Sequence, residues 1–318
     1  MWTKNTETPR QRANIKTRQR LQIRLDKIAF ECFRPPFSHS VPDVLSTPLV
    51  LSSPHSGRNY PASFLAQTRL CTHQLRQSED CYIDQILAPL TASGIPIIAA
   101  NFPRIYLDLN RAPDEWPPEA LADRPGDGTA DIWPISPRAR AGLGLVPVRV
   151  GADSDIYPHD ITADLVQGRL DALYTPYHNA LADLLHKARR TCGHALLLDC
   201  HSMPSHDISG NRRADIVLGD CYGETCHPDT IDYIENVFIS LGYGVVRNLP
   251  YAGGYITSHY GQRHNKIEAV QIEINKDLYL NPDTLEPHAG MAPLTANMKT
   301  AILHIKNYLD MPNNLAAE

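Results

Sequence analysis

Apolar residues along the chain follow two kinds of pattern. Short apolar runs closed by polar residues are typical of buried strands, and they occur in TPLVLSSP, IPIIAAN, RIYLDLN, HALLLDC, ADIVLGD, YGVVRN and AVQIEIN. Apolar residues at helical spacing occur over residues 79–90, 164–190, 227–241 and 291–309. Because strand-length runs alternate with helices, the pattern predicts an α/β sheet with helices on both of its faces.

Two of these helices show further features. The helix over 79–90 places Ile83, Ile86, Leu87 and Leu90 on one face, and Ser78 is a suitable N-cap. The stretch 164–190 carries leucines and a tyrosine at regular helical spacing, which predicts one long amphipathic helix.

The first 45 residues form a basic extension that ends in a proline-rich linker. They could form an arm that binds nucleic acid or a membrane. The alternative, which we favour, is a solvated extension or a surface helix packed on the domain. The residues expected to make that packing are Ile15, Leu21, Ile23 and Leu25. We therefore predict an extension over 1–45 and one catalytic domain over 46–318.

Residues 112–158 are rich in Pro, Gly and Asp and show little periodicity. A loop of this length inside a compact domain is often functional, for example as a segment that covers a substrate. Disorder is the other interpretation, and the sequence favours neither.

Composition narrows the class of protein. The chain has 318 residues, of which 42% are hydrophobic and 20% charged, as in an ordinary globular protein. The net charge of −5 gives no basic footprint for nucleic acid, and no apolar stretch is long enough to span a membrane. Seven cysteines without a C-x-x-C motif indicate reduced thiols in a cytoplasmic protein.

Two histidines follow predicted strands, where ligands of open α/β sheets bind. His55 lies in PHSG after VLSS, and His201 follows Asp199 at the end of HALLLDC. Either histidine alone could be a structural residue. However, metal-bound imidazoles usually donate their second N–H to a carboxylate, and Asp199 could be that partner for His201.

Carboxylates supply the rest of a possible metal site. Glu79 and Asp80 open a predicted helix, where the helix dipole alone could explain an acid. Glu273 lies within an apolar strand, although alternation could also place Gln271, Glu273 and Asn275 in solvent. Two histidines and a carboxylate suit a catalytic zinc ion, and a carboxylate that does not bind the metal could act as general base. Neither an H-E-x-x-H nor a G-x-S-x-G motif is present.

A cluster of polar residues follows Pro103. Arg104 and Arg111, which flank Asp108 and Asn110, could form a pocket that anchors an acidic substrate, since arginine binds carboxylates through two parallel hydrogen bonds. The alternative is a surface ion pair between Arg111 and Asp108, worth little. Gly253 and Gly254 indicate either a flexible loop near the site or a hairpin turn.

These motifs together resemble the N-formylglutamate amidohydrolase family. The resemblance rests on the order of PHSG, the acidic ED, RIYLDLNR, PYHNAL, LLLDCHS, ADIVLGD, GGYITSHYG and AVQIEIN, which extend over residues 48–280. It implies a zinc-carboxypeptidase-like α/β fold with a central mixed, mostly parallel sheet. It also implies one Zn²⁺ per chain held by His55, Asp80 and His201, with Asp80 favoured over Glu79.

The resemblance further implies roles in hydrolysis of a small carboxylated substrate, N-formylglutamate, to glutamate and formate. Glu273 would act as general base, and Arg104 would stabilise the oxyanion. The residues assigned to substrate binding are Asn110, Arg111, His178, Gly254 and Thr257. The alternatives are a zinc carboxypeptidase, a deacylase of another N-acyl amino acid, or a zinc- or ligand-binding protein without activity. The basic extension and Cys81, where some members have tryptophan, depart from the family pattern.

Overall fold

The fold is built on a central seven-stranded sheet, seen in a computed structural model that describes residues 9–121, 136–150 and 154–311. The strand order is β1-β3-β2-β6-β9-β7-β8. Strands β1 and β7 run antiparallel to β3 and β9, and the other neighbours are parallel. The predicted mixed, mostly parallel sheet of an α/β fold is therefore confirmed. The strands are β1 Phe37–Ser40, β2 Leu49–Ser53, β3 Ile97–Ala100, β6 Ala195–Met203, β7 Ile216–Gly219, β8 Val245–Arg247 and β9 Ile267–Asn275.

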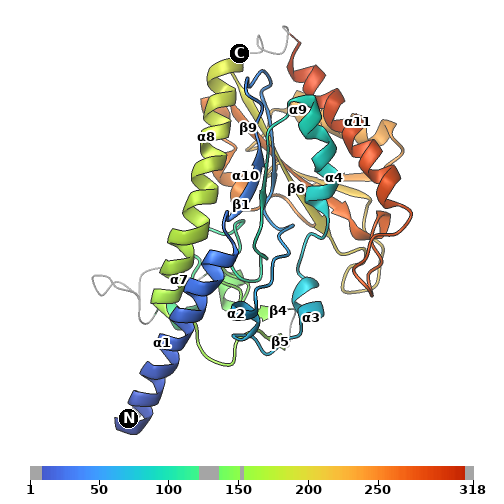
Figure 1. The fold of residues 1–318 in the computed structure, drawn as a ribbon. Coiled ribbons are helices and arrows are strands. Elements are labelled where there is room, and N and C mark those ends of the chain that lie inside the picture. Colours follow the sequence, from blue (N-terminus) through green and yellow to red (C-terminus); the bar gives the residue numbers. More distant parts are fainter. Residues whose placement is uncertain (1–8, 122–135, 151–153, 312–318) are drawn as a thin grey trace.

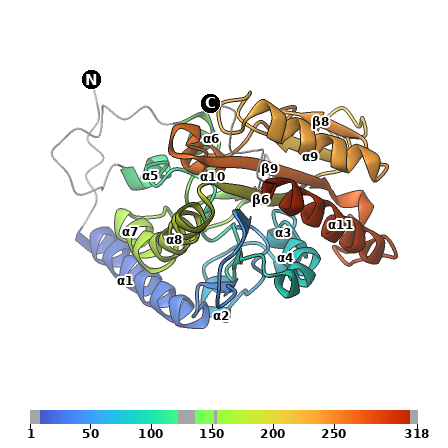
Figure 2. The same ribbon diagram turned by 90° about the horizontal axis from the view of Figure 1, so that it is seen from above.

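Helices cover both faces of this sheet (Figures 1 and 2). On one face lie α1 (Pro9–Cys32), α7 (Ala163–Arg169) and α8 (Thr175–Cys192). On the other lie α4 (Ile83–Leu87), α9 (Pro228–Ser240) and α11 (Met291–Leu309). The shorter elements are α2 Ala62–Leu65, α3 Thr72–Arg76, α5 Pro118–Leu121, α6 Pro137–Arg140, α10 Tyr255–Tyr260 and a two-stranded ribbon of β4 Arg149–Val150 and β5 Ser154–Asp155.

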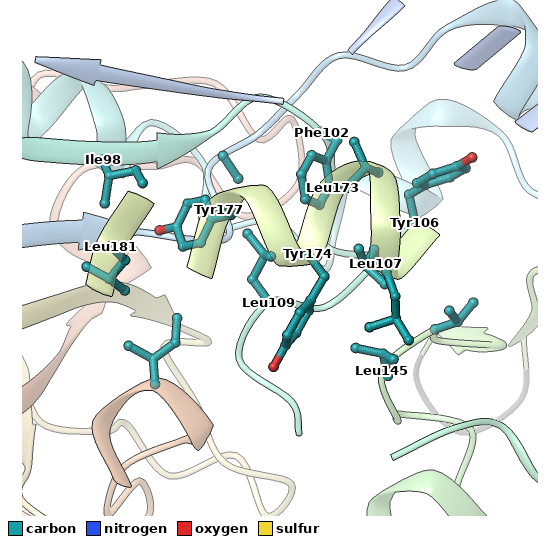
Figure 3. Close-up of a cluster of buried hydrophobic side chains, with 14 of the residues drawn as sticks. Ile98, Phe102, Tyr106, Leu107, Leu109, Leu145, Leu173, Tyr174, Tyr177 and Leu181 are labelled. Carbon is teal, nitrogen blue, oxygen red and sulfur yellow. The ribbon is translucent and has the colours of Figure 1, made fainter. Parts of the chain in front are cut away.

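Two apolar cores result, one on each face of the sheet. The core against α9 and α11 includes Leu51, Ile272 and Ile302. The core against α8 is drawn in Figure 3, where side chains of the segment 102–109 pack against the helical turns that carry Leu173 and Tyr177. Because that segment leads directly to Asn110, the second core fixes one wall of the candidate site.

Six of the seven predicted strands are confirmed, and the prediction of a strand at RIYLDLN is wrong. Residues 104–111 form consecutive turns. The side chain of Asp108 accepts a hydrogen bond from the backbone N–H of Asn110 (2.9 Å), which closes a turn. The residues from Ile105 to Asn110 are all buried, so no alternation between two faces of a strand exists here.

The helix predicted over 79–90 begins only at Ile83 and is followed by a 3₁₀ helix, Ala88–Ser93. Tyr82 adopts a left-handed conformation (φ 63°), which prevents an earlier start. Ser78 does not cap it, because its hydroxyl donates to the carbonyl of Leu75. The helix predicted over 164–190 is confirmed, with a π-helical turn, Leu170–Tyr174, between α7 and α8.

The first 45 residues contain α1 and β1. Helix α1 buries Ala29 and partly buries Ile23 and Leu25, and Phe33, directly after the helix, is also buried. Leu21, which we expected to pack, is 56% exposed, and the side chain of Ile15 lies outside the described residues. The polar strand β1 was not predicted, since FSHS lacks an apolar run. The division of the chain at residue 45 stays a prediction.

Within residues 112–158, positions 122–135 and 151–153 lie outside the described residues, and with them part of the predicted covering segment. A search of the described helices finds none that is both long and apolar enough to cross a membrane.

Candidate metal centre and active site

Three predicted ligands meet beside the sheet. His55 follows β2, His201 lies near the end of β6, and Asp80 lies in the turn before α4. One ligand atom from each lies within 4.8 Å of the others. All three residues are at most 2% exposed. The sequence prediction that these residues lie together is confirmed, although they are separated by up to 146 positions in the chain.

The imidazoles of His55 and His201 both turn Nδ1 towards Asp80 and Nε2 towards a second carboxylate. Nε2 of His55 lies 2.7 Å from Oδ1 of Asp108, and Nε2 of His201 lies 2.8 Å from Oδ2 of Asp199. A carboxylate can only accept, so each Nε2 donates its proton outward. Each Nδ1 then faces Asp80, at 3.4 Å for His55 and 2.8 Å for His201. Imidazoles that bind a metal are held in this way.

One buried nitrogen is suited to bind a metal ion. Nδ1 of His55 has no hydrogen-bond partner among the described residues. A buried polar atom without a partner costs about 1–3 kcal/mol, and a metal ion between His55, His201 and Asp80 would remove that cost. Two imidazole nitrogens and a carboxylate oxygen are donors that Zn²⁺ accepts. The residues therefore fit a divalent metal ion.

The electrostatics keep Asp80 and Asp108 ionised. Burial opposes ionisation of Asp80, but its hydrogen bond with His201 and the nearby imidazole of His55 outweigh burial and lower its pKa. Burial likewise opposes charge on Asp108, yet the charge of Arg104 holds the pKa of that carboxyl well below its usual range. Burial opposes charge on His201 too, but Asp199 and Asp80 raise its pKa. The pocket is therefore arranged for charged groups although it is buried.

Glu79, the alternative to Asp80, has other partners. Its carboxylate accepts hydrogen bonds from Tyr60 (2.6 Å), Arg76 (3.3 Å) and Cys81 (3.3 Å). Its backbone carbonyl accepts one from Lys276 (2.7 Å). These contacts fix the turn that presents Asp80, and Glu79 itself does not belong to the candidate metal group.

Glu273 lies beside His201 in the pairing of β6 with β9. It lines the same cavity and is 7% exposed. The side-chain amide of Gln271 donates to its Oε1 (2.7 Å), while burial raises the pKa of Glu273 to about 7. The alternative that β9 turns its polar side chains to solvent is wrong. Strand β9 lies between β6 and β7, and Gln271, Glu273 and Asn275 are all buried.

The segment 104–111 forms the adjoining wall. Nη2 of Arg104 lies 2.8 Å from Oδ2 of Asp108, whereas Nε of Arg111 is 3.9 Å away from the same oxygen. The alternative interpretation, an ion pair between Arg111 and Asp108 at the surface, is therefore wrong. Asp108 is only 2% exposed, and the guanidinium closest to it is that of Arg104. Arg104, Asn110 and Arg111 all line the cavity.

Gly254 is required for this wall. Its backbone lies so close to Asn110 that a Cβ at position 254 would meet the amide of Asn110 at 2.3 Å. The amide oxygen of Asn110 accepts a hydrogen bond from the N–H of Ile256 (2.8 Å) at the start of α10. Gly254 itself donates to Gln271 (2.7 Å). The glycine therefore allows the loop and α10 to hold Asn110 at the cavity.

Two predicted substrate contacts lie behind the cavity wall. His178 on α8 contacts the carbonyl of Leu109 through Nε2 (3.0 Å) and the hydroxyl of Tyr260 through Nδ1 (2.9 Å). Thr257 on α10 is fully buried. Neither residue lines the cavity. The structure thus places both as supports of the segments that form the wall.

The cavity over the metal centre has a volume of about 740 Å³. Its wall includes the three candidate ligands, Glu273 and the 104–111 segment, and it is the one place where these features converge among the described residues. A sequence model of a family described as N-formylglutamate amidohydrolase matches residues 47–280 of the chain, which include all of these residues. The chain belongs to the N-formylglutamate amidohydrolase family.

The chain is also similar to individual proteins with this description. The N-formylglutamate deformylase of Pseudomonas aeruginosa is 29% identical over 264 residues, which cover 80% of this chain and 90% of the relative. That of Pseudomonas putida is 29% identical over 236 residues, covering 73% and 82%. A crystal structure of N-formylglutamate amidohydrolase from Ralstonia eutropha JMP134 is 34% identical, with a TM-score of 0.77 over 86% of this chain and 98% of that one. The chain is an amidohydrolase of this deformylase-like type.

Sequence reasoning missed several residues of this amidohydrolase site. Asp108 was considered as part of a substrate-anchoring cluster or as a surface ion, but not as the partner of His55, because nothing in the sequence links the two residues. Lys276, Arg138 and Arg149 also line the cavity. Arg138 and Arg149 lie in the region without periodicity, so no pattern marked them. By contrast, the position of Asp199 next to Cys200 and His201 signalled its role, and its contact with His201 confirms that expectation.

Proposed function

We propose that this amidohydrolase cleaves N-formylglutamate to glutamate and formate, with one Zn²⁺ held by His55, Asp80 and His201. The observation that carries the proposal is the inward orientation of both Nδ1 atoms towards Asp80 beside a separate buried carboxylate, Glu273. The names of the relatives support the formylated substrate.

Bound zinc would supply a Lewis acid that polarises the amide carbonyl and lowers the pKa of water. Glu273 accepts the proton of the attacking water and then delivers it to the departing amine nitrogen. Its raised pKa, about 7, suits both steps, because a general base works best when its pKa lies near the working pH. Arg104, with its guanidinium at the cavity, stabilises the negative charge that develops on the carbonyl oxygen.

Asn110 and Arg111 bind the α-carboxylate of the substrate. Nε of Arg111 donates to the carbonyl of Leu143 (3.0 Å) and Nη1 to that of Asn110 (3.1 Å), which holds the guanidinium in place. Among the described residues Nη2 has no hydrogen-bond partner and can donate to a ligand. A fixed donor of this kind orients the scissile amide over the metal centre. His178, Gly254 and Thr257 act indirectly, by holding the wall that carries Asn110.

A panel of substrates tests this proposal. The purified enzyme is given N-formylglutamate, other N-formyl and N-acetyl amino acids, and short peptides, and the release of amine is measured. We expect the highest kcat/KM for N-formylglutamate. Preference for an acetylated amino acid would instead support a deacylase, and cleavage of peptides a carboxypeptidase. Metal binding without turnover of any compound would support a non-catalytic binding protein.

A further inference from the structure

N-formylglutamate has a second carboxylate, on its side chain, which the contacts above leave without a partner. Three further cationic side chains line the cavity: Arg138, Arg149 and Lys276. Two of them have other partners. Lys276 donates to the carbonyl of Glu79 (2.7 Å), and Nε of Arg149 lies 3.1 Å from the carboxylate of Asp155. For Arg138, no carboxylate partner exists among the described residues.

Arg138 and Arg111 are connected through one residue. The N–H of Leu143 donates to the backbone carbonyl of Arg138 (2.8 Å), and the carbonyl of Leu143 accepts from Nε of Arg111 (3.0 Å). Leu143 also lines the cavity. Both arginines are therefore attached to the same short stretch of backbone on one wall.

The helix that carries Arg138 is anchored to this wall. Ser136 caps α6, accepting from the N–H of Ala139 (3.1 Å), and its hydroxyl donates to Glu115 (2.9 Å). The carbonyl of Glu115 in turn accepts from Leu145 (2.7 Å), whose carbonyl accepts from Asp108 (2.8 Å). These bonds connect α6 with the turn that orients His55, so Arg138 has a defined place relative to the metal centre.

The charges on this wall favour an anion with two negative groups. Burial lowers the pKa of Arg111, and the nearby positive charges of Arg104 and Arg138 lower it further against the opposing effect of Asp108. Arg104 is compensated by Asp108 at 2.8 Å. The positive charges of Arg111 and Arg138 repel each other, and a dicarboxylate that bridges them would remove that repulsion.

We propose that Arg138 binds the side-chain carboxylate of the substrate and thereby selects an acidic acyl amino acid. This inference rests on the proposed function. It makes Arg138 a specificity-determining residue, while Arg111 binds the carboxylate common to all amino acids. Selection follows because a site built for a charged group loses its hydrogen bonds when a neutral group replaces it.

Arg138→Gln tests the inference, with Arg140→Gln as matched control. Arg140 is exposed on the same helix but lines a different hollow. Each variant is assayed as zinc-loaded enzyme on N-formylglutamate and on N-formylglutamine, its neutral analogue. For Arg138→Gln we expect kcat/KM for N-formylglutamate to fall about 10- to 100-fold, mainly through KM, with little change for N-formylglutamine. Arg140→Gln should change neither.

An equal loss on both substrates, or no loss on either, would overturn the role of Arg138. Failure of the proposed function looks different, since the wild-type enzyme would then turn over neither compound. In that case calorimetry still decides: glutamate should bind the wild-type protein more tightly than glutamine, and Arg138→Gln should remove the difference. Identical affinities of both ligands for the wild-type protein would contradict the inference.

Discussion

Nε2 of His55 lies 2.7 Å from Oδ1 of Asp108, and this contact turns Nδ1 of the same ring towards Asp80. Asp108 in turn is held by Arg104 and by the N–H of Asn110. One carboxylate therefore connects the metal centre with two residues of the substrate-binding wall. A change at Asp108 is expected to alter metal affinity first, although Asp108 does not face the metal.

Asp108→Asn should weaken metal binding about 10- to 100-fold, since it removes the charged partner that orients His55. The measurement is a competition titration of zinc with a coloured chelator. The matched control is Asp155→Asn, because Asp155 also pairs with an arginine of the region but at an exposed position. Unchanged zinc affinity in Asp108→Asn would show that the contact does not support the metal centre.

Glu273→Gln should retain zinc and lose at least about 100-fold in kcat, as expected when a general base is removed. Gln has the shape of Glu but cannot accept a proton. Glu268→Gln is the control on the same strand, since Glu268 bonds to Cys226 and to the N–H of His227 away from the cavity. Full activity of Glu273→Gln would eliminate Glu273 as the base.

Asp26→Asn should lower the free energy of unfolding by about 3–5 kcal/mol, because it leaves the buried Arg169 without its charge partner. Arg169 contacts Asp26 through two nitrogens, at 2.9 and 3.0 Å, and is fully buried. The comparison is Asp310→Asn, which breaks the exposed pair with Lys306 and should cost at most about 1 kcal/mol. Denaturant unfolding measures the free energy of unfolding of both variants. Equal losses of stability would contradict a stabilising role of the buried pair of Asp26 and Arg169.

This network also connects helix α1 with the active-site wall. The hydroxyl of Tyr106 donates to Asp26 (2.7 Å), and Nη1 of Arg169 donates to the carbonyl of Tyr106 (2.9 Å). Tyr106 lies between Arg104 and Asp108. Asp26 does not itself contact the cavity. We therefore expect any loss of activity in Asp26→Asn to follow from lower stability and to be reversed by conditions that restore folding.

His178 should make the protein less stable as the pH falls. Burial lowers its pKa from 6.5 to about 4 in the folded protein. The unfolded chain takes up a proton below pH 6.5 while the folded protein does not, so stability decreases between pH 6.5 and 4. The expected contribution is about 2 kcal/mol between pH 7 and 5. His178→Gln should lack this part of the pH dependence in denaturant unfolding, and an unchanged slope would exclude His178 as its source.

The sequence predicted the position of a site residue where that residue belongs to, or directly follows, a strand with a clear apolar pattern. His55 follows an apolar strand, and Asp199 and His201 lie in the second half of another, and neighbouring parallel strands bring their carboxyl ends to one edge. Glu273 could be recognised as a candidate but not placed, because β9 is central and the alternation of an exposed strand does not apply.

The rest depended on contacts between distant turns. Asp108 meets His55 across 53 positions. The segment that carries Asp108 looked like a strand because it is apolar, but its Leu107 and Leu109 pack in turns against the helical turns of Leu173 and Tyr177. The start of α4 was misplaced because Tyr82 takes a left-handed conformation that its residue type does not announce. Arg138 lies on a four-residue helix, too short for a periodic signal.

The most direct test of the account combines metal content with deformylation in one preparation. The protein is purified, stripped of metal with a chelator and reloaded with one equivalent of Zn²⁺, and formate released from N-formylglutamate is measured at each stage. We expect about one zinc per chain, loss of activity on stripping and recovery on reloading, with His201→Ala unable to recover. Full activity of the metal-free protein would contradict the account.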